Sequence, residues 1–473
     1  MKKIISILIL SGMIFFFACT PDQPSAPKLN VTTSELALSK VVAIGNSLTA
    51  GFQSSGLVED FQLNSYPYLL AQQMGKTEFE QPLIGEPGIG SPAGMTPMYL
   101  DEEGNITQDP LEVNPLFLLK NALLSRPYDN LGVPGADLND VLNTIDGSGG
   151  NPFFDMILRN PNLGNTTQLE QAVLLQPTTV LLWIGSNDVL GAALAGGDLT
   201  QITSQAEFQN LMTEVLTQLR TDLGSRLIIM GNIPNVTDIP YINTLDGVFI
   251  SGTPFVFGSN LQPIDFGNGT YLPLITTESD VEHITLVGLG AYQMGLGIPD
   301  SAYMVDNLSI GQGQAAQLEA GMRDGGLNPT GLPLDGTMTI TETEAAAIDA
   351  AVFGFNTIIG TLAQSFVVPV VDANALLALL NDSGIDGASG KFVLLDPATT
   401  AFSLDGVHPN NAGNAIIANA FIQVMNAVLE LETDIPTIDV STKLGQYLPE
   451  PSPKIVSSAI KNVRSLFVKE VKK

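Results

Sequence analysis

Four nearly unbroken apolar runs mark the chain and predict buried strands. They cover 41–44, 180–184, 226–230 and 366–371 and consist mostly of Val, Ile and Leu. A strand that is covered on one face only alternates apolar and polar residues, and these runs do not alternate. They are therefore typical of strands covered on both faces, as in a parallel sheet.

Helix-like segments lie between and after these runs. They occupy 207–219, before the third strand, 342–364, before the fourth, and 411–431, after it. The order strand–helix–strand–helix predicts an α/β fold with a mainly parallel sheet.

Two long segments interrupt this order. Residues 75–128 and 241–340 are rich in Gly, Pro and turn-forming residues and show no clear period. Segments of this length without periodicity are most often functional loops or insertions. We therefore expect one domain over 37–435 that carries insertions at about 75–128 and 241–340.

The N-terminus resembles an export signal. Two lysines precede an apolar stretch that is too short for a comfortable membrane span, so residues 1–18 are predicted to be a signal peptide. Phe16 to Cys19 then resembles a bacterial lipobox, although its first position usually holds Leu, and Cys19 is the only cysteine in the chain. An incidental cysteine in an ordinary signal is the alternative. Residues 19–36 are rich in Pro, Ser and Thr and are expected to form a tether.

The chain is strongly acidic. It has 19 basic and 48 acidic residues, which gives a formal net charge of −29. This charge argues against nucleic acid as a partner, because phosphate contacts need Lys and Arg. The exception is the C-terminal extension 436–473, whose last part, 454–473, is basic with apolar residues at helical spacing. This part is predicted to be an amphipathic helix that packs on the body or contacts lipid or an acidic partner.

Only two histidines are present, and one has a carboxylate at a useful spacing. Asp405 lies three residues before His408, so its carboxylate can accept the Nδ1 proton and leave Nε2 free as a base. His283 lies in the second insertion without a partner motif and is expected to be a surface or packing residue. Ser47 follows the first predicted strand in VVAIGNSLTAG and is a candidate nucleophile, or else a helix N-cap.

A serine hydrolase also needs hydrogen-bond donors for the oxyanion, and two loops offer them. In NLGVPGA, Gly132 would let a backbone N–H approach a substrate closely. In IGSND, Asn187 follows a buried strand and would lie beside Ser47 at the carboxyl edge of the sheet, where open α/β sheets bind ligands. Turn roles are the alternatives for both Gly132 and Asn187.

In chain order, GNSLTAG, NLGVPGA, GSND and DGVHPN resemble the four signature blocks of the SGNH (GDSL) hydrolase superfamily. The resemblance implies a flavodoxin-like three-layer α/β/α sandwich. It also implies that Ser47 is the nucleophile, His408 the base and Asp405 the acid that orients the base. The oxyanion hole would consist of the Ser47 N–H, the Gly132 N–H and the Asn187 side-chain amide.

The resemblance implies hydrolysis of carboxylic esters through a Ser-His-Asp triad and an acyl-enzyme, without metal or cofactor. The usual Asp after the first block's Gly is Asn46 here, and that Asp is not the triad acid. The expected partners are small-molecule, glycan or lipid esters and a membrane that holds a lipid on Cys19. The expected location is the bacterial cell envelope, with the outer membrane as the site of the anchor. Carbohydrate O-deacetylation, or a non-catalytic role in binding surface glycan or lipid, are the alternatives.

Overall fold

The computed structural model describes residues 34–447. The predicted signal peptide, Cys19, most of the tether and the basic C-terminal helix lie outside the described residues. A five-stranded parallel sheet forms the centre of the molecule, in the strand order β13-β8-β7-β1-β6. Its strands are β1 (Val41–Gly45), β6 (Asn130–Gly132), β7 (Thr179–Trp183), β8 (Leu227–Gly231) and β13 (Val370–Val371).

The strand order identifies the fold. Counted one to five along the chain, these strands lie in the order 2-1-3-4-5, which is the flavodoxin-like doubly wound order. Every residue of β1, β7 and β8 is buried, as their unbroken apolar sequences predict. The predicted fold class is confirmed.

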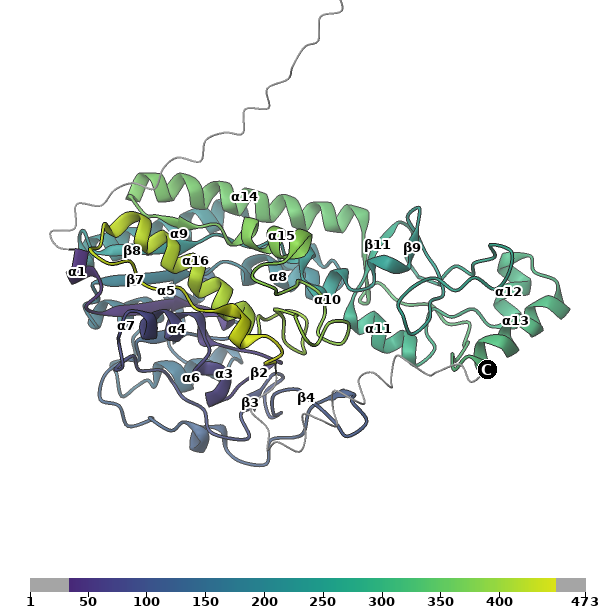
Figure 1. Ribbon diagram of the computed structural model, residues 1–473, viewed down its shortest axis with the longest axis horizontal. Helices are drawn as coiled ribbons and strands as arrows, with labels where there is room; N and C mark the ends of the chain where they lie inside the picture. The colour runs from purple at the N-terminus through teal and green to yellow at the C-terminus, as the bar shows by residue number, and fades with distance from the viewer. Residues whose placement is uncertain (1–33, 448–473) are drawn as a thin grey trace, which may run out of the picture.

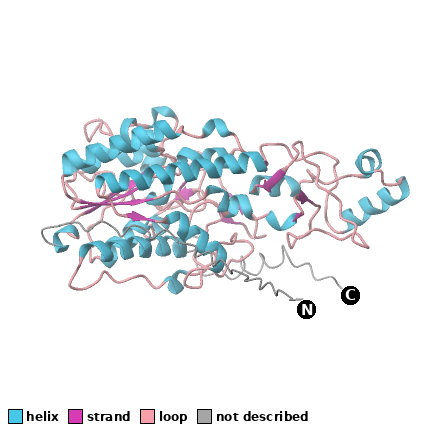
Figure 2. Cartoon of the chain, turned by 90° about the horizontal axis from the view of Figure 1, so that it is seen from above, coloured by secondary structure: helices cyan, strands magenta, loops and turns pink. Residues whose placement is uncertain are grey.

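Helices cover both faces of the sheet and give the body three layers (Figures 1 and 2). In one layer α4 packs against α16, and in the other α5, α7, α9 and α14 pack on one another. The stacked rings of Phe208 and Phe355, with centroids 4.1 Å apart, join α9 to α14. These helices are α4 (Tyr66–Gln73), α5 (Leu138–Asn143), α7 (Gln168–Leu174), α9 (Gln205–Leu223), α14 (Glu342–Phe366) and α16 (Asn411–Leu429).

Short elements complete the body. The short helices are α1 (Ser34–Ala37), α2 (Ser47–Ala50), α3 (Glu59–Gln62), α6 (Phe153–Leu158), α8 (Asn187–Leu194), α10 (Pro240–Asn243) and α15 (Ala373–Ser383). The 3-10 turns are η1 (Pro115–Leu118), η2 (Gly147–Gly149), η3 (Leu199–Gln201), η4 (Val236–Asp238), η5 (Asp246–Val248) and η6 (Val440–Lys443). In and beside the first insertion, two antiparallel pairs form, β2 (Gly56–Leu57) with β3 (Ile89–Gly90) and β4 (Tyr99–Leu100) with β5 (Ile106–Thr107).

The second insertion forms a lobe at one end of the elongated molecule (Figure 1). It has an apolar cluster of its own, in which the rings of Phe257 and Tyr292 stack with centroids 3.9 Å apart. The sequence did not predict its helices, two of which contain glycine, a residue that disfavours helices. The elements are α11 (Leu286–Gln293), α12 (Ser301–Leu308), α13 (Gln312–Asp324), the pair β9 (Phe249–Ile250) with β10 (Thr253–Pro254), and β11 (Val281–Ile284), which pairs with β12 (Thr339–Thr341).

Two strands differ from the sequence predictions. The predicted strand 366–371 is wrong in its first half, because α14 runs to Phe366 and ends at Val367, which has a left-handed φ of 53°. Only Val370–Val371 pairs with β8. The strand β6 was not anticipated, since its three residues include two that disfavour strands, Asn and Gly.

The body also extends beyond residue 435. Asn419 and Asn426 on α16 use their side-chain oxygens to accept the backbone N–H groups of Ile438 (2.7 Å) and Ile435 (2.9 Å). Tyr447 is 4% exposed. Residues 435–447 therefore pack against the body, with α16 as their support.

One buried carboxyl ties two helix starts together beside the carboxyl edge of the sheet. Asp188 on α8 is 2% exposed. It accepts the Leu138 N–H at the start of α5 (3.0 Å) and the Thr203 hydroxyl (2.8 Å). Burial raises the pKa of Asp188 to about 7, and the nearby Asp137 adds to this rise while the hydrogen bond from Thr203 opposes it.

This raised pKa predicts a pH-dependent stability. The unfolded pKa of Asp is about 3.9, so between about pH 4 and pH 7 the folded chain holds a proton on Asp188 that the unfolded chain releases. The contribution of Asp188 to stability therefore falls as the pH rises through this range. Because Asp188→Asn cannot ionise, we expect the Tm of the variant, relative to the parent, to be higher at pH 8 than at pH 5. Differential scanning calorimetry at both pH values measures this difference. An equal difference at the two values would contradict the assignment.

Candidate active site

The candidate nucleophile lies at the carboxyl edge of the central strand. β1 ends at Gly45, and Asn46 then caps α2 by accepting the Leu48 N–H (3.1 Å). Ser47 is the first residue of α2 rather than its cap, so the N-cap interpretation of Ser47 is wrong. The Ser47 hydroxyl is left to make other contacts.

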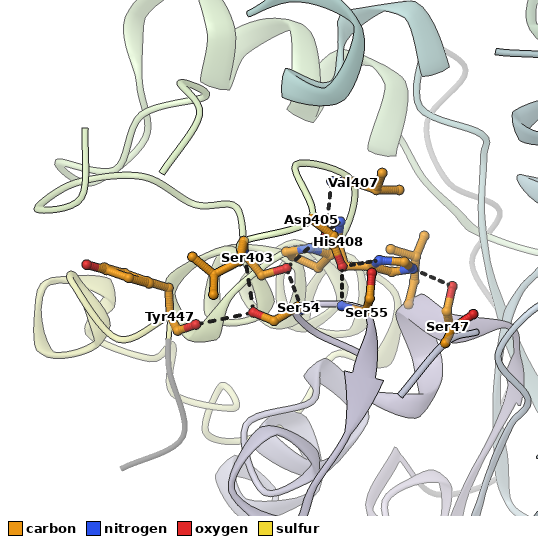
Figure 3. Close-up of polar contacts among 12 residues, drawn as sticks. Ser47, Ser54, Ser55, Ser403, Asp405, Val407, His408 and Tyr447 are labelled. Atoms are coloured by element: carbon orange, nitrogen blue, oxygen red, sulfur yellow. Dashed lines mark hydrogen bonds and ion pairs between the residues drawn. The ribbon is translucent and has the colours of Figure 1, made fainter. Parts of the chain in front are cut away.

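His408 brings Ser47 and Asp405 together across the chain. Its Nε2 lies 2.9 Å from Ser47 Oγ, although 361 residues separate the two. Its Nδ1 lies 2.9 Å from Asp405 Oδ2, and Figure 3 shows the three side chains in a row. The ring of Phe52 lies beside the imidazole, with centroids 4.9 Å apart. The three residues that the sequence pairs by spacing and motif thus form one continuous hydrogen-bonded row.

Asp405 is buried, yet it is held as a carboxylate. Burial raises its pKa, but His408 and the backbone N–H groups of Val407 and His408 lower it, so that the pKa of Asp405 is about 2. Both N–H groups lie 2.9 Å from Oδ1. A carboxylate that stays ionised beside Nδ1 holds the imidazole in the tautomer that leaves Nε2 as a base.

The candidate oxyanion donors divide into two that reach the site and one that does not. Asn187 opens α8 directly after β7 and its loop, and its Nδ2 donates to the Ala136 carbonyl (2.8 Å). This bond fixes the amide and leaves the second Nδ2 hydrogen for a ligand. Asn187 and Ser47 line one cavity. The structure contradicts the expectation for Gly132, because its N–H donates to Asn130 Oδ1 (3.0 Å) and is buried beneath α2.

Gly135 reaches the cavity where Gly132 does not. It lies three residues further along the same loop and lines the cavity with Ser47 and Asn187. Its φ is +83°, which favours glycine, and a Cβ there would lie 2.9 Å from Asn151 Nδ2. Asn151 donates to the Pro134 carbonyl (2.7 Å) and so holds this loop. The sequence block contains both glycines, and only the tertiary structure shows which of them faces the cavity.

A cavity of about 450 Å³ contains these groups, and side chains from several distant segments line it. The first insertion supplies Ser91, Ala93 and Met98, and Tyr241 comes from the start of the second. No Lys or Arg lies among the described residues that line the cavity, so the wall offers no cationic partner to an anionic substrate. The lining also includes Phe52, Ser55, Pro134, Gly150, Asn151, Pro152, Phe153, Leu190, Leu194 and Val407.

Part of this wall was predictable from the sequence. Leu190 and Leu194 follow Asn187 by three and seven residues on α8, so all three occupy one helix face. Gly185, before α8, has a φ of +112°, and a Cβ there would lie 2.9 Å from the ring of Phe208. Glycine at this position lets β7 turn tightly into α8 and so sets the direction of that face.

The other residues that the sequence singled out lie elsewhere. His283 Nδ1 is 2.8 Å from Asp246 Oδ1 in the second insertion, so it has a partner there, and it does not line the cavity. Cys19, the predicted lipidation site, lies outside the described residues.

Comparisons with known proteins found one matching family. Residues 41–263 match the family model of the GDSL-like Lipase/Acylhydrolase. No curated protein matches the chain. Two similar solved structures are LAE5, an alpha/beta hydrolase from the metagenome of Lake Arreo, Spain, and a catalytic mutant of Axe2, an acetylxylan esterase from Geobacillus stearothermophilus.

These structural likenesses are distant. LAE5 is 12% identical with a TM-score of 0.34, and the alignment covers 82% of this chain and 96% of that one. The Axe2 mutant is 11% identical with a TM-score of 0.33, and the alignment covers 82% and 94%. At these scores they carry no argument about function. Residues 41–263, which contain the first three sequence blocks, match the GDSL-like lipase and acylhydrolase family.

Proposed function

We propose that this protein hydrolyses neutral carboxylic esters through an acyl-enzyme on Ser47. The observation that carries the proposal is the row Ser47 Oγ–His408 Nε2–His408 Nδ1–Asp405 Oδ2, with 2.9 Å at each contact between residues. A serine hydroxyl is a weak nucleophile until a base takes its proton, and this row supplies the base and the group that orients it.

Acylation uses each group of the site once. Ser47 Oγ attacks the carbonyl carbon of the ester while His408 Nε2 takes the hydroxyl proton. Negative charge then develops on the carbonyl oxygen. The N–H groups of Ser47 and Gly135 and the free hydrogen of the Asn187 amide stabilise this charge. The charge on Asp405 stabilises the imidazolium that forms.

Collapse of the tetrahedral intermediate completes the first half-reaction. The bond to the alcohol oxygen breaks, and His408 Nε2 returns its proton to that oxygen, so a neutral alcohol leaves. Water then attacks the acyl-enzyme as His408 takes one of its protons. The carboxylic acid departs, and Ser47 regains its proton.

Replacement of Ser47 tests the nucleophile. We expect Ser47→Ala to lower kcat for a p-nitrophenyl ester by about four orders of magnitude or more, because no other oxygen attacks the carbonyl. Ser383→Ala, which removes a hydroxyl on α15 outside the cavity, should retain the parental rate. A fluorophosphonate probe should label the parent at Ser47 and fail to label Ser47→Ala. Full activity in Ser47→Ala would refute the proposal, and a folded parent that neither reacts with the probe nor turns over ester would support a non-catalytic scaffold.

Acetate release from acetylated xylan, measured beside a series of synthetic acyl esters, separates O-deacetylation from other ester hydrolysis.

Replacement of Asn187 tests the oxyanion donors. Asn187→Ala should lower kcat by roughly a hundred- to a thousand-fold and change KM little, because the amide acts on charge that is present only in the transition state. Steady-state kinetics on the same ester separates the two constants. An effect confined to KM would show that Asn187 binds substrate and does not stabilise the oxyanion.

We also propose that a lipid on Cys19 anchors the protein in the bacterial cell envelope, at the outer membrane. The proposal is supported by the position of the only cysteine at the end of an apolar export-like segment. When the full chain is expressed in a bacterium fed an alkyne-tagged fatty acid, the tag should appear on the protein and the protein in the membrane fraction. Cys19→Ser should abolish the tag. A tagged Cys19→Ser protein, or an untagged parent, would exclude this anchor.

A further inference from the structure

One short segment contacts all three members of the proposed triad. It runs from Ser47 to Ser55 and contains the nucleophile at its start. Phe52 places its ring against the imidazole of His408. At the end of the segment the backbone N–H of Ser55 donates to Asp405 Oδ2 at 2.7 Å, to the same oxygen that faces His408 Nδ1. The nucleophile, the base and the acid are therefore all fixed relative to one stretch of nine residues.

The end of this segment is an unusual turn. Gln53 and Gly56 exchange backbone hydrogen bonds of 3.0 and 2.9 Å around Ser54 and Ser55, as in a two-residue hairpin. Ser54 and Ser55 have φ values of 51° and 55°, in the left-handed region that such turns usually fill with Asn or Gly. Two adjacent side-chain-bearing residues in this region persist only where surrounding contacts hold them, and such sites cluster around functional groups.

Ser403 is the contact that holds the turn to the acid. Its Oγ accepts the Ser54 N–H (2.9 Å) and donates to Asp405 Oδ1 (3.1 Å). Leu404 N–H in turn donates to Ser54 Oγ (3.3 Å). Ser54 and Ser403 are fully buried, so water does not take over these bonds. Figure 3 shows Ser403 between the turn and the carboxylate.

With these contacts, five hydrogen bonds converge on one buried carboxylate. Oδ2 faces His408 Nδ1 and the Ser55 N–H. Oδ1 faces the Ser403 hydroxyl and the N–H groups of Val407 and His408. Both oxygens are occupied, so the carboxylate cannot rotate without breaking several of these bonds. A carboxylate free to rotate would lose its alignment with Nδ1.

We propose that Ser403 and the Ser54–Ser55 turn are positioning groups of this enzyme, which hold Asp405 in the orientation that makes His408 a base. This inference rests on the proposed function, because it concerns the turnover of the same triad. Ser403 does not line the cavity, so it acts through Asp405 and does not touch the substrate. It should affect the chemical step and leave substrate binding unchanged.

The experiment compares two serines that bond an aspartate in the same loop region. Ser403→Ala deletes the bond to Asp405. Ser389→Ala is the matched control, since Ser389 Oγ donates to Asp396 Oδ2 (2.8 Å) outside the cavity. Ser403→Thr restores a hydroxyl on the same carbon. For each variant, kcat and KM on a p-nitrophenyl ester, the rate of labelling by a fluorophosphonate and the Tm are measured.

We expect Ser403→Ala to lower kcat and the labelling rate together by roughly ten- to a hundred-fold at an unchanged KM, as for the loss of a hydrogen bond to a charged group. Ser403→Thr should recover most of this loss. Ser389→Ala should keep the parental rates even where its Tm falls as much as that of Ser403→Ala.

Parental kcat in a folded Ser403→Ala would overturn the inference while leaving the proposed function intact, because Ser47→Ala would still be inactive. Equal losses in Ser403→Ala and Ser389→Ala would also overturn it, since they would show a structural effect only. If Ser403→Ala fails to fold, Ser403→Thr decides the question. A folded Ser403→Thr whose kcat is as low as the kcat of Asp405→Asn, a variant without the triad carboxylate, would contradict a role for the hydroxyl.

Discussion

β1 pairs in parallel with β6 on one side and with β7 on the other, and this pairing sets Gly45 level with both Gly132 and Trp183. The three strands end together, so the loops that follow them must meet at one edge of the sheet. Ser47 follows the first strand, Gly135 the second and Asn187 the third. A shift of register in either ladder would separate Ser47 from the proposed oxyanion donors, because consecutive residues of a strand are about 3.3 Å apart.

His408 and Asp405 reach this edge by a different route. They lie in a loop before α16, and no strand of the central sheet leads into that loop. The loop is held by hydrogen bonds to the turn at Ser54–Ser55, and that turn follows soon after α2, which begins at Ser47. An ionised carboxylate in a buried site is stable only when several donors surround it, and here the donors also determine where the carboxylate points. Electrostatic stabilisation and geometric alignment are thus provided by the same contacts.

The two insertions contribute to the molecule in different ways. The first contributes Ser91, Ala93 and Met98 to the cavity wall. The second contributes Tyr241 to the cavity wall at its start, and the rest of it forms a lobe with its own apolar cluster. In a chain of net charge −29, Asp405 is the one acidic residue among the described residues that line the cavity.

Local patterns in the sequence determined the strands β1, β7 and β8, the long helices and the Asp405–His408 pair, because apolar periodicity and short motifs act over a few residues and need no partner. The same patterns misplaced β13 and missed β6, whose residues become strands only through pairing with neighbours that lie far away in the chain. Only the tertiary structure showed that Gly135, and not Gly132, lines the cavity. The Gly132 N–H already donates to the Asn130 side chain, and the sequence does not reveal this bond. The contacts of Ser54 with Ser403 and of Ser55 with Asp405 join residues about 350 apart, and no local pattern in either segment predicts them. The sequence alone therefore determined elements with a periodic pattern and residue pairs that are close in the chain. Contacts between distant loops depend on how the whole sheet packs, so only the tertiary structure decided them.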